Sequence, residues 1–337
     1  MADSEPLSRL ARELEPDFKF VDLPAHYDGV YYYAIAIDPL ARGEAHRLID
    51  LAPHRYGHPG MGWAGWILSL GNPHWAPQAL LLAGLAGMAV ATFLSALIAT
   101  RLGATAWAAL AVALNPGLIF GVTTDTAEPL SAAILAAAIY AWMSERRVVA
   151  YALLTVVCFF KFQLVLIPIG IALFELVRFL QGERDRDLSR RLAGLAFGPV
   201  AFLLWSFYVQ VQLDEAPTSL ASELLSLPFL GFFSTLNSLG QIHTMDFANG
   251  QIAAAQVPIL SVVMVIFVIG IALSARLKTF MHALFLLQGL LVLCLNHWNL
   301  YYPKDMLRAI AIPLLLLLAV AYTELKPGER PGTFPED

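Results

Sequence analysis

Long apolar runs alternate with short polar junctions along most of this chain. A transmembrane helix needs about 20 mostly apolar residues, and nine runs of roughly this kind follow one another from residue 78 onward. They predict an all-α, polytopic transmembrane bundle with eight or nine spans. The fourth run is short, so it either forms a half-helix or merges with the fifth. The runs are Gln78–Thr100, Ala104–Gly121, Ala127–Met143, Val148–Phe160, Gln163–Leu180, Leu192–Gln212, Gln251–Ser274, Thr279–His297 and Leu307–Thr323.

The basic residues of the junctions fall mainly in every second junction. Cytoplasmic loops of membrane proteins are enriched in Lys and Arg, so this alternation orients the chain if all nine runs span. The basic junctions then face the cytoplasm, the C-terminus is cytoplasmic, and the chain is a multi-pass protein of an inner or plasma membrane. The basic set is Arg101, Arg146, Arg147, Arg184, Arg186, Arg190, Arg191, Arg276, Lys278, Lys326 and Arg330, whereas the opposite set holds only Lys161 and Lys304.

The same orientation divides the chain into three parts. Residues 1–76 form a polar N-terminal segment and a first outer loop, residues 77–325 form the helical domain with a second long outer loop at 213–250, and residues 326–337 form a cytoplasmic tail. Within the first part, the apolar stripe Val30–Ile37 predicts a short amphipathic helix at the membrane interface.

The N-terminal segment complicates this orientation, because its first 27 residues are polar and contain no spanning helix. The simplest expectation is that a transmembrane helix which precedes this segment is missing from the chain. The alternative is a cytoplasmic N-terminus with an inverted topology, which Arg9, Arg12 and Lys19 favour. The internal junctions are more numerous than these three residues, so we retain the outer position.

The composition agrees with a membrane protein and excludes some functions. Hydrophobic residues make up 58% of the chain, charged residues make up 14%, and the mean hydropathy is +0.65. Soluble domains carry about 25% charged residues. The net charge of -5 gives no basic surface for nucleic acid. The two cysteines, Cys158 and Cys294, lie in apolar runs and predict no disulfide framework.

Four short motifs carry a resemblance to a known enzyme class. Residues 27–36 read YDGVYYYAIA, residues 55–59 read RYGHP and precede Trp63, residues 125–130 read DTAEPL, and residues 302–308 read YPKDMLR. In pattern and order they resemble the GT-C-type membrane glycosyltransferases, and most of all the bacterial branch related to the GPI-anchor mannosyltransferases. The resemblance covers most of the chain in hydropathy layout and about 30 residues in motif. The family has a helix before the first motif, and Tyr27 stands here where the family usually has Trp.

The resemblance implies the transfer of a sugar, with mannose favoured, from a polyprenyl-phosphate donor to a lipid or glycan acceptor on the outer face of the membrane. It assigns Asp28 as the general base, because a sugar hydroxyl is a poor nucleophile until a carboxylate accepts its proton. The departing lipid phosphate is anionic and needs cationic partners rather than a proton. We expect no cofactor, and the use of a divalent metal stays open. The alternative for Asp28 is a structural turn before Gly29.

The other site predictions rest on charge and position. Lys161 lies between apolar runs, where an ionisable residue indicates function unless its side chain reaches the surface. Arg308 lies one turn into the last span, and Asp125 lies at the mouth of an earlier one. The aromatic residues are explained equally well by an interfacial belt. The predicted contacts to substrate and donor phosphate are Arg55, His58, Asp125, Lys161, Lys304 and Arg308, and the predicted sugar contacts are Tyr31, Tyr32 and Trp63.

His54 and His58 are spaced by four residues, which would place both on one face of a helix and allow them to bind a metal ion. Pro53, Gly57 and Pro59 argue against a helix at this position, and so against zinc.

Two other function classes remain as alternatives. A transporter or flippase would place ionisable residues near the bilayer midplane and would show a pathway through the membrane. A non-catalytic membrane subunit derived from the GT-C fold would bind partners instead of substrate. An enzyme is expected to gather Asp28, Arg55 and Arg308 around one outward-facing cavity.

Overall fold

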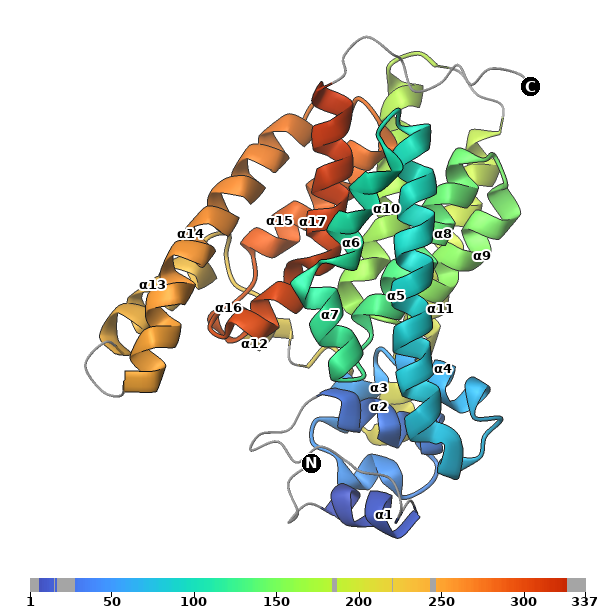
Figure 1. The fold of residues 1–337 in the computed structure, drawn as a ribbon. Helices are drawn as coiled ribbons and strands as arrows, with labels where there is room; N and C mark the ends of the chain where they lie inside the picture. The colour runs from blue at the N-terminus through green and yellow to red at the C-terminus, as the bar shows by residue number, and fades with distance from the viewer. Residues whose placement is uncertain are drawn as a thin grey trace. The chain divides into compact units, whose positions relative to one another are not determined.

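The computed structural model describes residues 6–14, 16, 28–183, 187–219, 221–242 and 247–325, and in these residues the chain is helical (Figure 1). Extended pairing in this part of the chain is limited to an isolated bridge between Leu225 and Leu295. The prediction of an all-α protein is therefore confirmed.

The helices follow one another with short connections. The α-helices are α1 (Pro6–Leu14), α2 (Asp28–Ile37), α3 (Ala52–Tyr56), α4 (Gly60–Leu68), α5 (Ala76–Arg101), α6 (Leu110–Ala113), α7 (Pro116–Thr123), α8 (Glu128–Met143), α9 (Arg147–Val157), α10 (Leu166–Leu180), α11 (Leu188–Leu213), α12 (Ala221–Leu224), α13 (Leu230–Ile242), α14 (Phe247–Ser274), α15 (Phe280–Leu293), α16 (His297–Leu300) and α17 (Pro303–Leu325). Short 3₁₀ helices are η1 (Ala45–Leu48), η2 (Pro73–Trp75), η3 (Ala106–Ala109) and η4 (Phe162–Val165).

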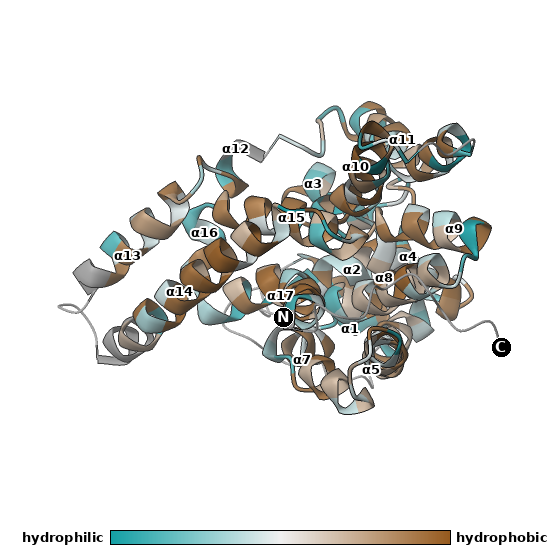
Figure 2. Ribbon diagram, turned by 90° about the horizontal axis from the view of Figure 1, so that it is seen from above, coloured by the Kyte–Doolittle hydropathy of each residue, from teal (hydrophilic) through white to brown (hydrophobic). Residues whose placement is uncertain are grey.

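Several helices are long and apolar enough to cross a membrane, which makes the chain a multi-pass membrane protein. Apolar residues cover these helices in Figure 2. In the described residues there are five such helices, or six if one pair bent by 52° counts as a single span. The bend follows from Pro116, whose ring disfavours helical backbone at the preceding residue. The five are Pro73–Arg101, Phe162–Leu180, Leu188–Leu213, Ala254–Ser274 and Pro303–Glu324, and the bent pair is Ala106–Ala113 with Pro116–Thr123.

Three of the predicted spans are shorter helices. Helices α8, α9 and α15 contain 16, 11 and 14 residues. With a rise of 1.5 Å per residue, a helix of this length falls short of a hydrocarbon core about 30 Å thick. Each of the nine predicted apolar runs thus contains a helix, while five or six of them have spanning length.

The helices belong to two compact units. The first unit consists of Met1–Thr92, Leu118–Val165 and Ala196–Leu220, and the second consists of Phe93–Gly117, Leu166–Leu195 and Ala221–Asp337. All the residues of the first outer loop, and the turns before α8 and after α9, therefore lie in the first unit.

Helix α2 forms part of the core of the first unit. Its residues from Tyr31 to Ala36 are all buried, and α4 packs along it. The two helices approach closely at Gly62, where a β-carbon would lie 2.4 Å from the side chain of Ile35. The predicted helix over residues 30–37 thus forms, but its middle is buried on all sides instead of presenting a polar face.

Junctions of the first unit that the charge pattern assigns to one side of the membrane lie close together. Gly60 donates its amide hydrogen to the carbonyl oxygen of Phe159 at 2.8 Å. A β-carbon at Gly29 would lie 2.2 Å from the carbonyl oxygen of Thr124. The first loop therefore touches the turn before α8 and the turn after α9, as expected if all three share one side.

The second unit is organised around α15, which packs against α10, α14 and α17. At the C-terminal end of α15, Asn296 donates its amide hydrogen to Leu224 at 3.0 Å, which ties the loop after α11 to this junction. At its N-terminal end, the carboxylate of Glu324 accepts a hydrogen bond from Lys278 at 2.6 Å and lies 2.9 Å from Nε2 of His282. Each end of this unit thus joins junctions with the same predicted membrane side.

Candidate functional site

Helix α2 begins at Asp28, so the carboxylate of this residue lies at the N-terminus of the helix. An acidic side chain at a helix N-terminus is stabilised by the helix dipole. The next residue, Gly29, rests against the carbonyl of Thr124, and a side chain there would collide with it. Glycine permits this close approach because it has no β-carbon. The start of α2 is thus held against the turn before α8, with the Asp28 side chain 32% exposed.

Helix α3 carries Arg55 and ends at Tyr56, so the expectation that residues 53–59 are not helical is wrong for residues 53–56, whereas His58 lies outside the helix as expected. Pro53 occupies the first turn, where its missing N–H leaves no helical hydrogen bond unmade. Gly57 ends the helix as its C-cap. Tyr56 donates its hydroxyl hydrogen to the carbonyl oxygen of Asp38 at 2.8 Å, which ties α3 to the end of α2.

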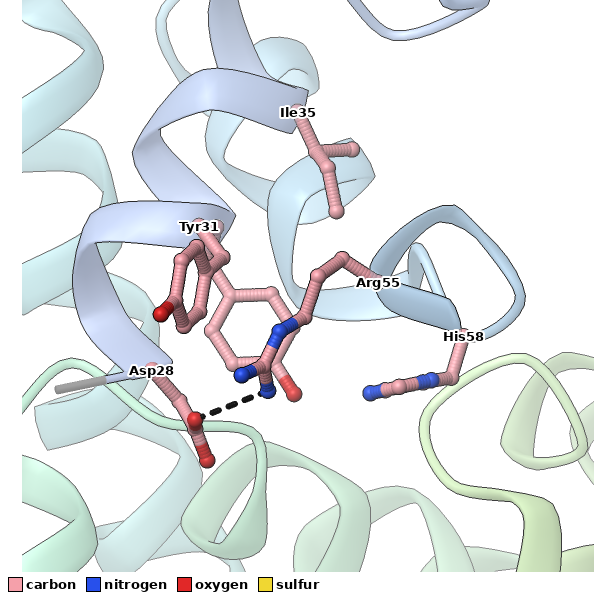
Figure 3. A pocket seen from close by; sticks show the side chains of 6 residues that line it. Asp28, Tyr31, Ile35, Arg55 and His58 are labelled. Carbon is pink, nitrogen blue, oxygen red and sulfur yellow. Dashed lines mark hydrogen bonds and ion pairs between the residues drawn. The ribbon is translucent and has the colours of Figure 1, made fainter. Parts of the chain in front are cut away.

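Arg55 forms an ion pair with Asp28 (Figure 3). Its Nη1 lies 3.0 Å from Oδ1 of Asp28, and its Nη2 lies 3.8 Å from Oδ1 of Asp50. The guanidinium carbon lies 3.8 Å from the ring centre of Tyr31. The Arg55 side chain is 18% exposed, so solvent screens this pair less than it screens a pair on the surface. Two carboxylates and one aromatic face together fix the guanidinium plane beside Asp28.

A narrow recess lies beside this ion pair. Nε of Arg55 and Nδ1 of His58 are buried and have no hydrogen-bond partner among the described residues. Buried polar atoms in proteins are nearly always hydrogen-bonded, so these two nitrogens are available to a ligand. The residues that line the recess are Asp28, Tyr31, Tyr32, Ile35, Arg55 and His58.

His58 is a neutral member of this group. Its ring packs against His54 at 5.0 Å and against Phe162 at 5.1 Å between ring centres. Burial lowers the pKa of His58 well below its ordinary value, and the neighbouring His54 and Arg55 lower it further. Burial also lowers the pKa of His54. His58 therefore offers a hydrogen bond without charge, and Arg55 supplies the positive charge in the recess.

Two tyrosines predicted as sugar contacts line the recess. Burial raises the pKa of Tyr31, and a hydrogen bond with Asp50 raises it further, while Arg55 opposes the shift. The Tyr31 hydroxyl therefore keeps its proton. The ring of Tyr32 meets that of His58 edge-on at 6.4 Å. Both aromatic side chains are neutral, and a contact with sugar stays a prediction for them.

Asp125 belongs to the same unit but does not line the recess. It precedes α8 with a left-handed backbone (φ +52°), and its Cβ would be 3.3 Å from a β-carbon placed on Gly29. Its Oδ1 is buried without a hydrogen-bond partner in the described part of the chain. Burial raises the pKa of Asp125 to about 6. This carboxyl thus has an unusual affinity for a proton, directly beside the start of α2.

Lys161, in the turn after α9, forms an ion pair with Glu128 at the start of α8. Nζ of Lys161 lies 2.6 Å from Oε1 of Glu128, with exposed fractions of 17% and 0%. The sequence placed Glu128 at a helix N-terminus but gave no sign of this pairing, because the two residues are separated by a complete helical hairpin. The predicted contact between Lys161 and the donor phosphate stays a prediction.

Trp63 lies on α4 and is engaged in packing. Its ring contacts Phe159 at 5.3 Å and Trp205 at 4.7 Å between ring centres, and its Nε1 donates to the carbonyl oxygen of Pro39 at 3.0 Å. It is not among the residues that line the recess.

The two remaining predicted residues lie in the second unit. Arg308 lies near the start of α17, as the sequence predicted, whereas Lys304, predicted in the preceding junction, lies in the first turn because the helix begins at Pro303. Arg308 is 9% exposed, and Nζ of Lys304 lies 5.7 Å from the ring centre of Tyr302. The expected gathering around one cavity is thus observed for Asp28 and Arg55 within the first unit.

The recess offers a carboxylate, a guanidinium, a neutral imidazole and two aromatic faces. This set can accept a proton and bind an anion. Three or more His, Cys, Asp or Glu side chains grouped to hold a metal ion are not found among the residues that the structure describes.

No protein-family model matches the sequence, and no curated protein matches it. Solved structures that are similar to this chain include two of ArnT from Cupriavidus metallidurans. The apo structure has a TM-score of 0.40 and 16% identity, covering 94% of this chain and 76% of that chain. The structure bound to undecaprenyl phosphate has a TM-score of 0.46 and 19% identity, covering 94% of this chain and 59% of that chain. Both scores are below 0.5, so these similarities do not define a family for this chain.

Proposed function

We propose that this protein is a membrane glycosyltransferase that moves a sugar from a polyprenyl-phosphate donor to a lipid or glycan acceptor on the outer face of an inner or plasma membrane. The observation that carries the proposal is the Asp28 carboxylate, held 3.0 Å from the Arg55 guanidinium at a recess of a multi-pass membrane protein. The reaction needs a base for the acceptor hydroxyl and a cation for the phosphate. Mannose is the favoured sugar because residues 27–36 resemble the mannosyltransferase branch.

In the proposed reaction, the acceptor oxygen bonds to the anomeric carbon of the sugar while the bond from that carbon to the phosphate oxygen breaks. Asp28 takes the hydroxyl proton, and the lipid phosphate leaves with the bonding electron pair. Arg55 donates hydrogen bonds to the phosphate and stabilises the charge that develops on it. His58 supplies one neutral hydrogen bond. Lys304 and Arg308 are proposed as further cationic partners.

The ion pair also suggests the order of events. The Asp28 carboxylate and a donor phosphate would compete for the same guanidinium donors of Arg55. A bound phosphate would therefore release the carboxylate to accept a proton from the acceptor. Donor binding would thus prepare the base, and Asp28 would stay paired with Arg55 until a donor is bound.

Sugar transfer by the purified protein tests this function. Radiolabelled polyprenyl-phosphate sugars would be supplied in turn, with a membrane lipid extract as acceptor, to wild type, Asp28→Asn and Glu44→Gln. Glu44 is a matched control because it is an exposed acid (77%) in the same loop. We expect transfer by wild type and by Glu44→Gln, and a loss of about 100-fold or more in Asp28→Asn. Full activity of Asp28→Asn would reject Asp28 as the base. No transfer from any donor would favour a transporter or a non-catalytic subunit.

A further inference from the structure

The ion pair between Glu128 and Lys161 joins two segments of the first unit that are distant in sequence. The Glu128 side chain is fully buried, and its Oε1 accepts from Lys161 at 2.6 Å. A buried ion pair adds little to stability compared with apolar residues of the same size, whereas the loss of one partner is costly. Such a pair is therefore better suited to fix the relative position of two segments than to stabilise the fold as a whole.

Glu128 lies at the end of the turn that supports α2. Between α7 and α8 the chain turns through Thr124 and Asp125, and Thr126 donates its amide hydrogen to Gly121 at 2.9 Å to close the turn. The main chain of α2 at Gly29 rests directly on the carbonyl of Thr124. A shift of the start of α8 is thus transmitted to the start of α2.

Lys161 lies in the turn that supports the segment following α3. A β-carbon on Gly60 would lie 2.6 Å from the ring of Phe160, and a β-carbon on Gly57 would lie 2.7 Å from the ring of Phe162. Lys161 stands between these two phenylalanines. A shift of this turn is therefore transmitted to residues 57–60, which include His58 and directly follow the helix that carries Arg55.

From these contacts we infer that Glu128 and Lys161 are positioning residues, whose ion pair holds the segment of Asp28 in register with the segment of Arg55 and His58. Glu128 follows the turn that contacts Gly29, and Lys161 lies in the turn that contacts Gly57 and Gly60. Breaking the pair lets the two segments move apart and lengthens the distance between the base and the phosphate-binding groups. This inference rests on the proposed function for its catalytic consequence, but the mechanical coupling can be measured without it.

A double-mutant cycle tests the inference. The variants are Glu128→Gln, Lys161→Met and the double variant. We expect each single change to lower kcat about tenfold or more while KM for the lipid donor changes less than about threefold. The double variant is expected to lose no more than the worse single variant, because residues that act as a unit are not additive. A large rise in KM for Lys161→Met, with losses that multiply in the double variant, would instead make Lys161 a direct phosphate contact and overturn the inference.

Hydrogen exchange of the peptides that cover residues 28–60 gives a readout that does not depend on activity. Exchange is expected to rise in both single variants and to rise no further in the double variant. Unchanged exchange in all three would overturn the inference whatever the enzyme assay shows. Raised exchange in a protein that transfers no sugar from any donor would uphold the coupling and count against the proposed function alone.

The pair between Glu175 and Arg191 provides a matched control. It is also buried, with exposed fractions of 6% and 21% and a separation of 3.0 Å, but it joins α10 to α11 in the second unit. Glu175→Gln is expected to lower the unfolding temperature as much as Glu128→Gln does, with kcat and the exchange of residues 28–60 unchanged. An equal loss of kcat in this control would attribute the effect of Glu128→Gln to general destabilisation and overturn the inference.

Discussion

Gly29 stands so close to Thr124 that a β-carbon on it would lie 2.2 Å from the Thr124 carbonyl oxygen. The nearest atom belongs to the main chain and not to a flexible side chain, so an added methyl group forces the backbone to move. The contact directly follows the proposed base, Asp28. The close contact at Gly29 therefore links the packing of α2 to the position of Asp28 in the recess.

Replacement of Gly29 by Ala is expected to destabilise the fold by about 1 to 3 kcal/mol, which is the usual cost of overpacking, and to lower sugar transfer. Thermal unfolding and the transfer assay measure the two effects. Gly84→Ala is the matched control, because a β-carbon there meets nothing closer than 3.7 Å and the residue lies within α5. The control is expected to be neutral or to stabilise by up to about 1 kcal/mol through helix propensity. Equal unfolding temperatures for the two variants would contradict the tight contact.

Arg55→Lys keeps the positive charge and removes the planar fork. Lysine is a point charge that cannot stack on Tyr31 while it donates to Asp28 and stays close to Asp50. The loss of one charge-assisted hydrogen bond is worth about 1.5 to 3 kcal/mol, so we expect transfer to fall by about 10 to 100-fold. Initial rates at saturating acceptor would measure this change.

The control for this substitution is Arg47→Lys. Arg47 pairs with Glu44 at 3.3 Å in the same loop, and the two side chains are 66% and 77% exposed. Exposed pairs of this kind contribute little, so activity should stay close to that of wild type. Similar losses in the two variants would show that the loop, and not the geometry of Arg55, controls the rate.

Five of the six residues that line the recess could be predicted, because they lie in two short motifs, and Ile35 was not among the predicted site residues. Asp28 and Tyr31 share one string, and Arg55 and His58 share another, so local sequence was sufficient to select them. The structure shows that the two strings meet. It adds that His58 is neutral, a property that depends on burial by Phe162 and on the charge of Arg55 and therefore cannot be seen in the motif.

Other features of the site depend on tertiary packing and were missed. Glu128 begins α8 and Lys161 follows α9, so the two residues are 33 positions apart in the sequence. Only the packing of α8 against α9 brings their side chains together. Hydropathy predicted α9 as a span because its residues are apolar, but helix length is set by where the chain turns. The turn at Cys158 ends this helix after 11 residues.

The membrane orientation is a separate prediction. If the basic junctions face the cytoplasm, a cysteine at position 44 lies outside and a cysteine at position 187 lies inside. Both native residues, Glu44 and Asp187, are exposed acids, so the substitutions leave the basic residues in place. In a background without Cys158 and Cys294, an impermeant maleimide should label Glu44→Cys in intact cells and Asp187→Cys only after permeabilisation. The reverse pattern would establish the inverted topology.

Asp125 gives the protein a specific dependence on pH. Burial raises its pKa to about 6, above the value of about 3.9 in an unfolded chain. Between these values the folded state holds a proton that the unfolded state has lost, so stability falls as the pH rises through about 4 to 6 and stays lower above that window. At neutral pH the Asp125 carboxylate is therefore ionised and buried, and this charge lowers the stability of the folded state.

Asp125→Asn removes this titration, and asparagine adopts the left-handed backbone of this position readily. We expect the variant to unfold at a higher temperature than wild type at pH 7.5, with a gain of about 3 kcal/mol, and at nearly the same temperature at pH 4, where both side chains are neutral in the folded state. An equal gain at both pH values would assign the effect to the backbone instead of the charge. If the more stable variant also transfers less sugar, the buried carboxyl is retained for activity at the expense of stability, as is common for functional residues. Unaltered transfer would make Asp125 dispensable for the reaction, and Asp28 would then be sufficient as the acidic group of the site.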